Sequence, residues 1–373
     1  MDFNSYKLTV YGLVFFIFLI LLADGASAQL KPREKPFKIL GINIDTLLQS
    51  PIKEIDTTFI TPYYNFLHIH PIGEDRNYSL YVSDKKSAIA YKPNVPFSIG
   101  AGLSYKWLNL ALMFKLPFTD KALERKGKTN QVGFGLSYTG RKLLISTYYQ
   151  SAKGMYLSNP EEFDLDWFSK NNSYPIREDL LVRTLFTQTY YIFNYKKFSN
   201  RAAYSFQERQ KKSAGSFLLG GSFNFFQLRS DSSLAFFPGN EAFNDKRSVN
   251  FNSYGFSINP GYAHTLVFKK IFFASVFLRP GIAFKMNKAF DLTETKGPYK
   301  FQLGWEGNIS ATLGINNDNY YGGISYSLLL FSDKLKDTGI YNSYTYLKIL
   351  IGRRFNFEPK GVLRKVPGFN NKP

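Results

Sequence analysis

Alternation of apolar residues with small or polar ones runs through most of this chain, and it constrains the fold more than any other feature. In the stretch 97–107, Phe, Ile, Ala, Leu, Tyr and Trp fall on one face, while Ser, Gly and Lys fall on the other. A strand with two such different faces can place one against lipid and the other toward a polar interior. We therefore predict an all-β fold, a transmembrane antiparallel up-and-down β-barrel.

The first 28 residues have the pattern of a cleavable export signal. Lys7 precedes an apolar run at 8–22, and Ala26-Ser27-Ala28 forms a small-x-small cleavage site. The run is shorter than the roughly 20 residues that a membrane-spanning helix needs. We predict cleavage after Ala28 and a location in a bacterial outer membrane. The chain has no Cys, which excludes disulfides, thiolate nucleophiles and a lipid anchor on an N-terminal Cys.

Composition favours a membrane barrel over a soluble β-sandwich. The chain has 37 Phe and 26 Tyr, and barrels place such rings on the lipid face and in interfacial girdles. A sandwich would show the same period of two with fewer outward rings. The formal net charge is +19, but the basic residues scatter through turns and loops without a recognition motif. We therefore predict no nucleic-acid partner and expect contacts with outer-membrane lipid and lipopolysaccharide, with the barrel-assembly machinery as partner during insertion.

The alternating segments number thirteen, which is odd for a barrel whose N-terminus lies in the periplasm. The first two are 59–70 and 78–91, and an additional strand could lie at Arg201 to Gln207. We predict twelve strands, with fourteen as the alternative. The predicted organisation is a signal peptide at 1–28, a periplasmic N-terminal arm at 29–57, the barrel at 58–357 and a basic C-terminal tail at 358–373.

Connection lengths predict the orientation, because outer-membrane barrels have short periplasmic turns and longer extracellular loops. Short connections are expected near 107, 140, 264–270 and 316–318. Long connections are expected at 117–129, 151–180, 230–250, 287–299 and 332–342.

Strand parity predicts which charged side chains point into the lumen. The predicted set is Lys106, Lys115, Arg279, Lys285, Glu306, Lys348 and Arg354. Cations clustered beside Glu306 would plug a narrow lumen, whereas unpaired cations would select anions. Twelve strands enclose little free space, which favours the plug.

Several short stretches resemble one uncharacterised outer-membrane family, domain of unknown function 4421, found in Bacteroidetes-type bacteria. They are YKPN at 91–94, GAGLSYKW at 100–107, KGKT at 126–129, YQ at 149–150, KGMYL at 153–157 and QKKSAGS at 210–216. The resemblance covers most of the mature chain. It implies a barrel in the cell envelope and brings no known active site.

The chemistry expected of the barrel is limited. His68 and His70 share a strand face but make an incomplete metal site, so we predict no catalytic residue, metal or cofactor. The leading interpretation is passage or binding of small, anionic solutes. One alternative is an acyl hydrolase with a Ser beside His264 or His68 at lipid level. The other is a structural or adhesive barrel with a filled lumen. Oligomeric state stays open.

Overall fold

The computed structural model describes the barrel and its connections. The predicted signal peptide, most of the predicted arm and most of the C-terminal tail lie outside the described residues. The described residues are 55–83, 88–106, 108–231, 249–290, 298–335, 338–361 and 363, with the two-residue strands β1 (Lys38–Ile39) and β2 (Ile42–Asn43).

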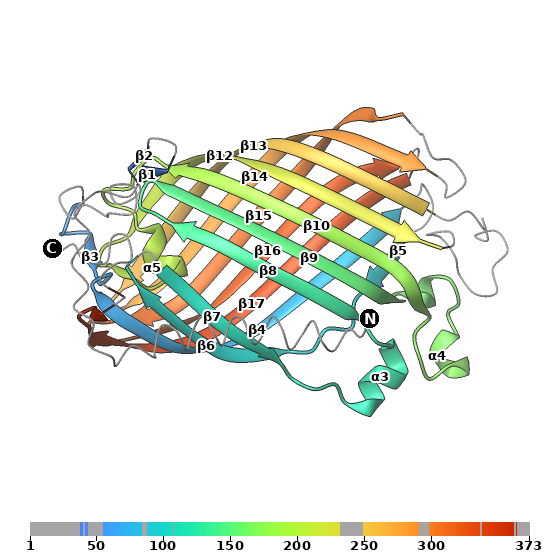
Figure 1. Cartoon of the computed structure of the whole chain (residues 1–373), viewed down its shortest axis with the longest axis horizontal. Helices are drawn as coiled ribbons and strands as arrows, with labels where there is room; N and C mark the ends of the chain where they lie inside the picture. Colours follow the sequence, from blue (N-terminus) through green and yellow to red (C-terminus); the bar gives the residue numbers. More distant parts are fainter. Residues whose placement is uncertain are drawn as a thin grey trace.

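Ten strands form a closed antiparallel ring, in which each strand is hydrogen-bonded to its neighbours and β17 pairs with β4 (Figure 1). The fold is therefore an all-β antiparallel barrel, whereas the predicted count of twelve strands is not confirmed. Around the ring the strands are β4 (Phe66–Ser83), β5 (Ala88–Lys92), β9 (Leu143–Leu157), β10 (Ile176–Ile192), β12 (Ala214–Ser230), β13 (Val249–Phe268), β14 (Phe272–Phe290), β15 (Lys300–Asn316), β16 (Tyr320–Leu335) and β17 (Thr338–Asn356).

Three further strands fill the wall between β4 and β9 beyond the short strand β5. They are β6 (Ser98–Tyr105), β7 (Leu108–Lys115) and β8 (Asn130–Thr139). β6 pairs with β4, β7 pairs with β6, and β8 pairs with β9. Within the described strands no ladder joins β7 to β8. We call the facing edges of β7 and β8 the seam; Figure 1 shows both strands on the same side of the barrel.

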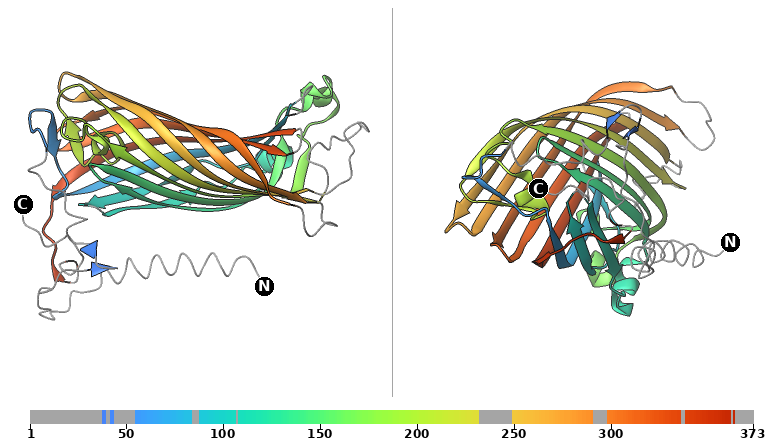
Figure 2. Two further views of the ribbon diagram at one scale, coloured as in Figure 1. Left: turned by 90° about the horizontal axis from the view of Figure 1, so that it is seen from above. Right: turned by 60° about the vertical axis from the view of Figure 1, so that its left-hand side comes forward.

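The two ends of the barrel differ in their connections. At the short-turn end, β6 and β7, β8 and β9, β13 and β14, and β15 and β16 are joined by tight turns. The long connection 193–213 between β10 and β12 also lies there; it holds α5 (Asn200–Tyr204) and β11 (Glu208–Gln210), which pairs with β3 (Ile60–Pro62). We call residues 193–213 the plug. The loop end carries α3 (Asp120–Lys126) and α4 (Trp167–Lys170) (Figures 1 and 2). The short 3₁₀ helix η2 (Pro160–Glu162) lies between β9 and α4.

An apolar outer surface surrounds the barrel. On β15 the outward side chains Phe301, Leu303 and Leu313 are strongly exposed, while the intervening Ser310 and Thr312 are buried inside. Apolar side chains exposed around a closed strand ring are stable in lipid and costly in water. The ring is therefore built to span a membrane. Within the described residues, no helix is long and apolar enough to cross one.

Three sequence expectations differ from the structure. The segments 59–70 and 78–91 are not two spanning strands, because β4 runs unbroken through Pro71 and its outer end pairs with the short β5. The predicted long loop at 332–342 is a tight hairpin instead, since β16 ends at Leu335 and β17 begins at Thr338. The possible strand at Arg201 to Gln207 is largely the short helix α5 of the plug.

Placing a charge on the outer surface should destabilise the barrel. Ile309 lies near the middle of the outward row of β15 and is 42% exposed. We expect Ile309→Arg to lower the free energy of unfolding in vesicles by about 2–4 kcal/mol, because the guanidinium faces lipid. Urea titration with a gel-shift readout measures this. Ser169→Arg, on the exposed helix α4, should change it by less than about 0.5 kcal/mol; equal effects would contradict the assignment.

Candidate functional site

The interior at the loop end is filled by an apolar cluster. Tyr78, Leu80 and Val82 of β4 point inward there and are buried. They meet inward side chains from the opposite wall, including Phe226 and Phe251, whose rings lie 6.1 Å apart. Side chains in an open lumen would keep contact with water. Burial at this level therefore means that side chains occupy the space.

A polar layer follows toward the middle of the barrel. The Glu306 carboxylate accepts hydrogen bonds from the hydroxyls of Ser222 (2.8 Å) and Ser257 (2.7 Å) and from the Asn259 amide. All four side chains are buried. A buried carboxylate is tolerated only when its oxygens are hydrogen-bonded, and these three donors meet that need with neutral groups.

Two ion pairs stabilise other parts of the interior. Lys285 Nζ lies 2.9 Å from Asp333 Oδ1, and both side chains are almost fully buried. Arg76 Nε lies 2.7 Å from Glu74 Oε1, and the Tyr346 hydroxyl donates to Glu74 at 2.8 Å. Each buried acid is thus matched by a nearby base, which lowers the cost of keeping charge away from water.

The plug closes the interior at the short-turn end. Its Phe206 ring stacks on Tyr321 of β16 with ring centroids 5.2 Å apart, and lies 5.8 Å from Phe273 of β14. Arg354 Nη2 donates to the Phe206 carbonyl at 2.7 Å, and the guanidinium lies 4.0 Å from the Tyr63 ring centroid. The plug is therefore packed against the barrel wall from the inside.

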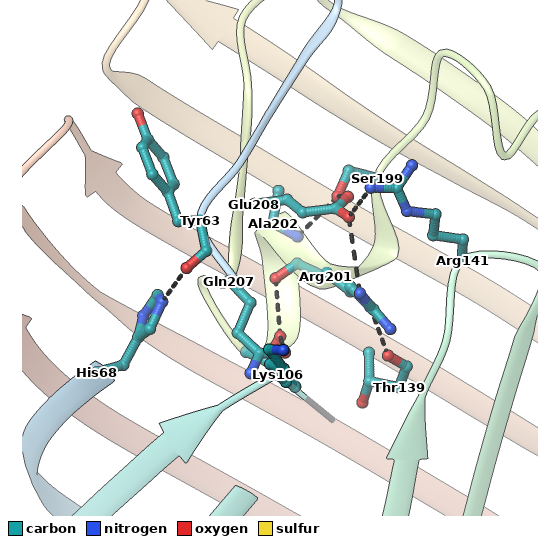
Figure 3. Close-up of polar contacts among 11 residues, drawn as sticks. Tyr63, His68, Lys106, Thr139, Arg141, Ser199, Arg201, Ala202, Gln207 and Glu208 are labelled. Atoms are coloured by element: carbon teal, nitrogen blue, oxygen red, sulfur yellow. Dashed lines mark hydrogen bonds and ion pairs between the residues drawn. The ribbon is translucent and has the colours of Figure 1, made fainter. Parts of the chain in front are cut away.

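A buried charge cluster fixes the plug to the opposite side of the mouth (Figure 3). Glu208 Oε1 lies 3.2 Å from Arg141 Nη2 and 3.9 Å from Arg201 Nη1. The Ser199 hydroxyl donates to Glu208 Oε2 at 2.7 Å, and the same hydroxyl accepts the Ala202 N–H, which caps α5. Burial lowers the pKa of the Arg201 guanidinium, while Glu208 opposes that shift. One carboxylate thus lies between two guanidinium groups, and the three side chains together keep a net charge of +1.

The plug also contacts both edges of the seam. Arg201 Nε donates to the carbonyl of Thr139, the last residue of β8, at 2.7 Å. Gln207 Nε2 donates to the carbonyl of Lys106, in the turn that leads into β7, at 2.6 Å. Figure 3 shows both contacts close to the Glu208 cluster. The plug therefore connects the two edges where the seam meets the short-turn end.

The inner face of the seam is accessible, unlike the inner face of the paired strands. Ala111 of β7 and Gly133, Gly135 and Ser137 of β8 lie at inward positions and are exposed. The outward neighbours Phe134 and Leu136 are also exposed, at 62% and 76%. At the loop end of the seam, Lys115 Nζ donates to the side chain of Gln131 at 3.1 Å. The seam is thus an unpaired part of the barrel wall that is exposed on both its inner and its outer face.

The structure distributes the predicted lumen-facing charges over separate levels. Arg279, Lys285, Glu306 and Arg354 are inward and buried, and each has its own hydrogen-bond or ion-pair partners. Lys348 lies opposite Glu74 in the ladder between β17 and β4. Lys115 lies on the seam. Lys106 differs from the prediction, because it belongs to the turn after β6 and not to a strand.

Each of the three histidines contacts a group of a tyrosine. His68 contacts the Tyr63 carbonyl, His70 the Tyr321 hydroxyl and His264 the Tyr262 hydroxyl. Among the described residues, no serine hydroxyl is hydrogen-bonded to a histidine, as a Ser-His hydrolase would need. In the same part of the chain, no group of three or more His, Cys, Asp or Glu side chains could hold a metal ion.

Sequence reasoning did not find the Glu208 cluster. Arg141 and Glu208 are 67 positions apart (208 minus 141), and only the folding of the plug into the mouth brings them together. One signal was present in the sequence: Glu208 is the only acidic residue between 193 and 213, a stretch rich in Lys and Arg. A single acid among so many bases points to an internal ion pair.

A closed antiparallel strand ring with an apolar outer surface and a filled interior defines an outer-membrane-type β-barrel. Within that class, the chain belongs to the family described as domain of unknown function DUF4421, whose model matches residues 54–355.

Three solved structures align with this chain at low identity. Outer membrane protease OmpT from Escherichia coli is 7% identical with a TM-score of 0.36, covering 80% of this chain and 100% of that one. Ail of Yersinia pestis is 10% identical with a TM-score of 0.21, covering 78% and 99%. The Pseudomonas putida toluene transporter TodX is 10% identical with a TM-score of 0.22, covering 84% and 92%. Among curated proteins, no sequence matches this chain.

Removing the central carboxylate should loosen the plug. In Glu208→Gln, the buried guanidinium groups of Arg141 and Arg201 lose their counter-charge, and breaking a buried ion pair costs about 3–5 kcal/mol. We expect faster amide hydrogen exchange in the plug and faster tryptic cleavage after Lys196 and Lys212. The control Asp164→Asn removes the exposed pair with Lys170 and should leave both rates unchanged. A plug that resists trypsin as before would contradict this role of Glu208.

Proposed function

We propose that this protein is an outer-membrane barrel that admits a membrane-borne amphipathic molecule sideways, through the seam between β7 and β8. One observation carries the proposal: the two strands are not paired, and the inner face between them is exposed. A molecule with an acyl-type chain can reach such an opening from within the bilayer.

The filled interior argues for this side route and against passage of small solutes along the barrel axis. Apolar side chains occupy the loop end, hydrogen-bonded charges occupy the middle, and the plug occupies the mouth. Inward cations that hold carboxylates or carbonyls do not offer binding sites to a passing anion. A filled interior is also expected of a barrel with a purely structural role. Such a barrel would make no use of the seam.

The sequence of the two edges allows the seam to close. If Lys115 and Gln131, whose side chains are hydrogen-bonded, are placed opposite each other, Met113 falls opposite Gly133 and Ala111 opposite Gly135. In that register inward residues face inward residues, and outward Leu110 and Leu112 face the outward side chains of β8. Closing the seam would therefore complete a wall of twelve strands at membrane level.

In hydrocarbon, the open edges of the seam are costly, which favours closing the seam when no ligand lies in it. Unpaired backbone N–H and C=O groups cost several kcal/mol each in hydrocarbon, so bare edges are paired when no ligand separates them. A ladder formed by closing the seam would be short and would contain Gly133 and Gly135, which weaken strand pairing. Separating two neighbouring strands to admit a ligand therefore costs the least free energy between β7 and β8.

The proposal predicts that the folded barrel does not conduct ions. The mature protein, refolded and inserted into a planar bilayer, should give no steady single-channel current under a salt gradient, because the interior is packed. Insertion is verified by the gel shift of the same sample. A steady anion-selective conductance would restore the interpretation of solute passage along the axis.

Locking the seam should stop ligand entry. The chain has no Cys, so Ala111→Cys/Gly135→Cys introduces one defined disulfide across the seam, and a Cβ at Gly135 meets no atom closer than 3.5 Å. A diazirine-labelled dodecanoate in phosphatidylcholine vesicles should photolabel β7, β8 and the plug of the reduced protein. Oxidation should abolish this labelling, as read by peptide mass spectrometry.

The control disulfide joins strands that are already paired. Thr312 and Ser325 are cross-strand partners whose hydroxyls lie 3.0 Å apart, so Thr312→Cys/Ser325→Cys closes nothing that was open. Its oxidation should leave the labelling intact. Equal labelling of both oxidised proteins would rule out entry through the seam and favour the structural alternative.

A further inference from the structure

Arg76 lies inside the barrel, level with the loop end of the seam. It occupies an inward position of β4, and its side chain is nevertheless 40% exposed. The ladders place Glu74 opposite Ser98 of β6, and Ser98 opposite Lys115 at the loop end of the seam. Because the side chain of Arg76 points inward, its exposed part faces the interior of the barrel behind the seam.

Tyr148 of β9 connects Arg76 to the β8 edge of the seam. The Arg76 guanidinium lies 5.8 Å from the ring centroid of Tyr148 and 5.0 Å from that of Tyr346. A Cβ atom on Gly133 would lie 3.4 Å from the Tyr148 hydroxyl, and one on Gly135 would lie 3.5 Å from the Tyr148 ring. The guanidinium and the inner face of the β8 edge therefore adjoin the same aromatic ring.

The charges around Arg76 do not balance. The Glu74 carboxylate contacts Nε of Arg76 at 2.7 Å and Nη2 at 3.2 Å. Lys348 of β17 lies directly opposite Glu74 in the ladder, where the Cβ atoms of partners are about 5 Å apart. Within the described part of the chain, the Lys348 ammonium has neither a hydrogen bond nor an ion pair, unlike that of Lys285. Two cations beside one carboxylate leave an excess of one positive charge.

A buried hydrogen-bond donor lies at the same edge of the seam. Gln150 is paired with Gly133 in the ladder between β8 and β9 and is only 4% exposed. Its Oε1 accepts the Tyr148 hydroxyl at 2.7 Å, but no group of the described residues accepts a hydrogen bond from its Nε2. Buried polar groups are normally paired, so this amide indicates a ligand that carries acceptor oxygens.

We infer that the ligand of the seam is an amphipathic molecule with an anionic head, a carboxylate or a phosphate, which lies inside the barrel and is bound by Arg76, Lys348 and Gln150. The inference rests on the proposed function, because it names the head of the molecule whose chain occupies the seam. Guanidinium and ammonium groups form short, strong hydrogen bonds to carboxylate and phosphate oxygens. A cationic head would be repelled by the excess positive charge.

The test compares two photoreactive probes with the same twelve-carbon chain, one with a phosphate head and one with a trimethylammonium head. The full mature barrel in phosphatidylcholine vesicles is irradiated with each probe, and labelled peptides are identified by mass spectrometry. The phosphate probe should label β7 and β8 at a much lower concentration than the trimethylammonium probe, because only its head complements the cations.

The variant Lys348→Gln removes the unpaired cation and leaves the pair of Arg76 with Glu74 intact. No described residue bonds the Lys348 ammonium, so the variant should fold as before, which the gel shift of each sample verifies. Half-maximal labelling should require about tenfold more phosphate probe, since one charge-assisted contact is lost. The matched control Lys128→Gln removes the same charge from an exposed residue at the loop end and should leave labelling unchanged.

Equal labelling by the two probes would overturn the anionic head, and so would equal labelling of Lys348→Gln and Lys128→Gln. Competition by inorganic phosphate at matched concentration would reduce the site to one for free anions and overturn the amphipathic class. If the seam disulfide abolishes labelling but Lys348→Gln does not weaken it, this inference fails while entry through the seam stands. If Lys348→Gln weakens labelling that the disulfide leaves intact, entry through the seam fails instead.

Discussion

Hydrogen bonding between backbone groups in a medium without water is the constraint on which this structure depends. Every strand that faces lipid must give its N–H and C=O groups to neighbours, and the ladder between β17 and β4 meets this demand by closing the ring. β5 closes the remaining sector at the loop end. The edges of β7 and β8 are the exception among the described strands, and an exception to so strict a rule is where function is expected.

The interior follows from the same constraint. A closed ring of this size leaves room for side chains but not for bulk water, so every inward charge needs a partner inside the barrel. Lys285 is paired with Asp333, Glu306 is hydrogen-bonded by neutral donors, and Arg354 is hydrogen-bonded by carbonyl oxygens of the plug and the β15–β16 turn. Each of these charges finds its partners close by, which explains why the interior is filled by many small networks and not by one cluster.

The sequence predicts the local features well and the long-range ones poorly. Alternation over residues 301–315 assigns each side chain of β15 to the correct face, because that pattern depends only on strand geometry. Pro71 and the polar residues after it read as a break, yet β4 continues, since pairing with β17 and β6 overrides local propensity. The plug could not be foreseen: α5 is one turn long, and its stability comes from contacts such as Arg141–Glu208 that exist only after the barrel closes.

The plug and the seam form one mechanical unit, because the plug bonds the backbone of both edges. The carbonyls of Lys106 and Thr139 are the acceptors nearest the short-turn end, and Gln207 and Arg201 satisfy them there. Deeper in the bilayer, only pairing between β7 and β8 or separation by a ligand is available to the remaining edge groups. Arg201 also belongs to the buried charge cluster around Glu208, so displacement of the β8 edge is transmitted to the ion pairs that hold the plug. A ligand that parts the seam therefore acts on the closure of the mouth, and an event that withdraws the plug acts on the seam.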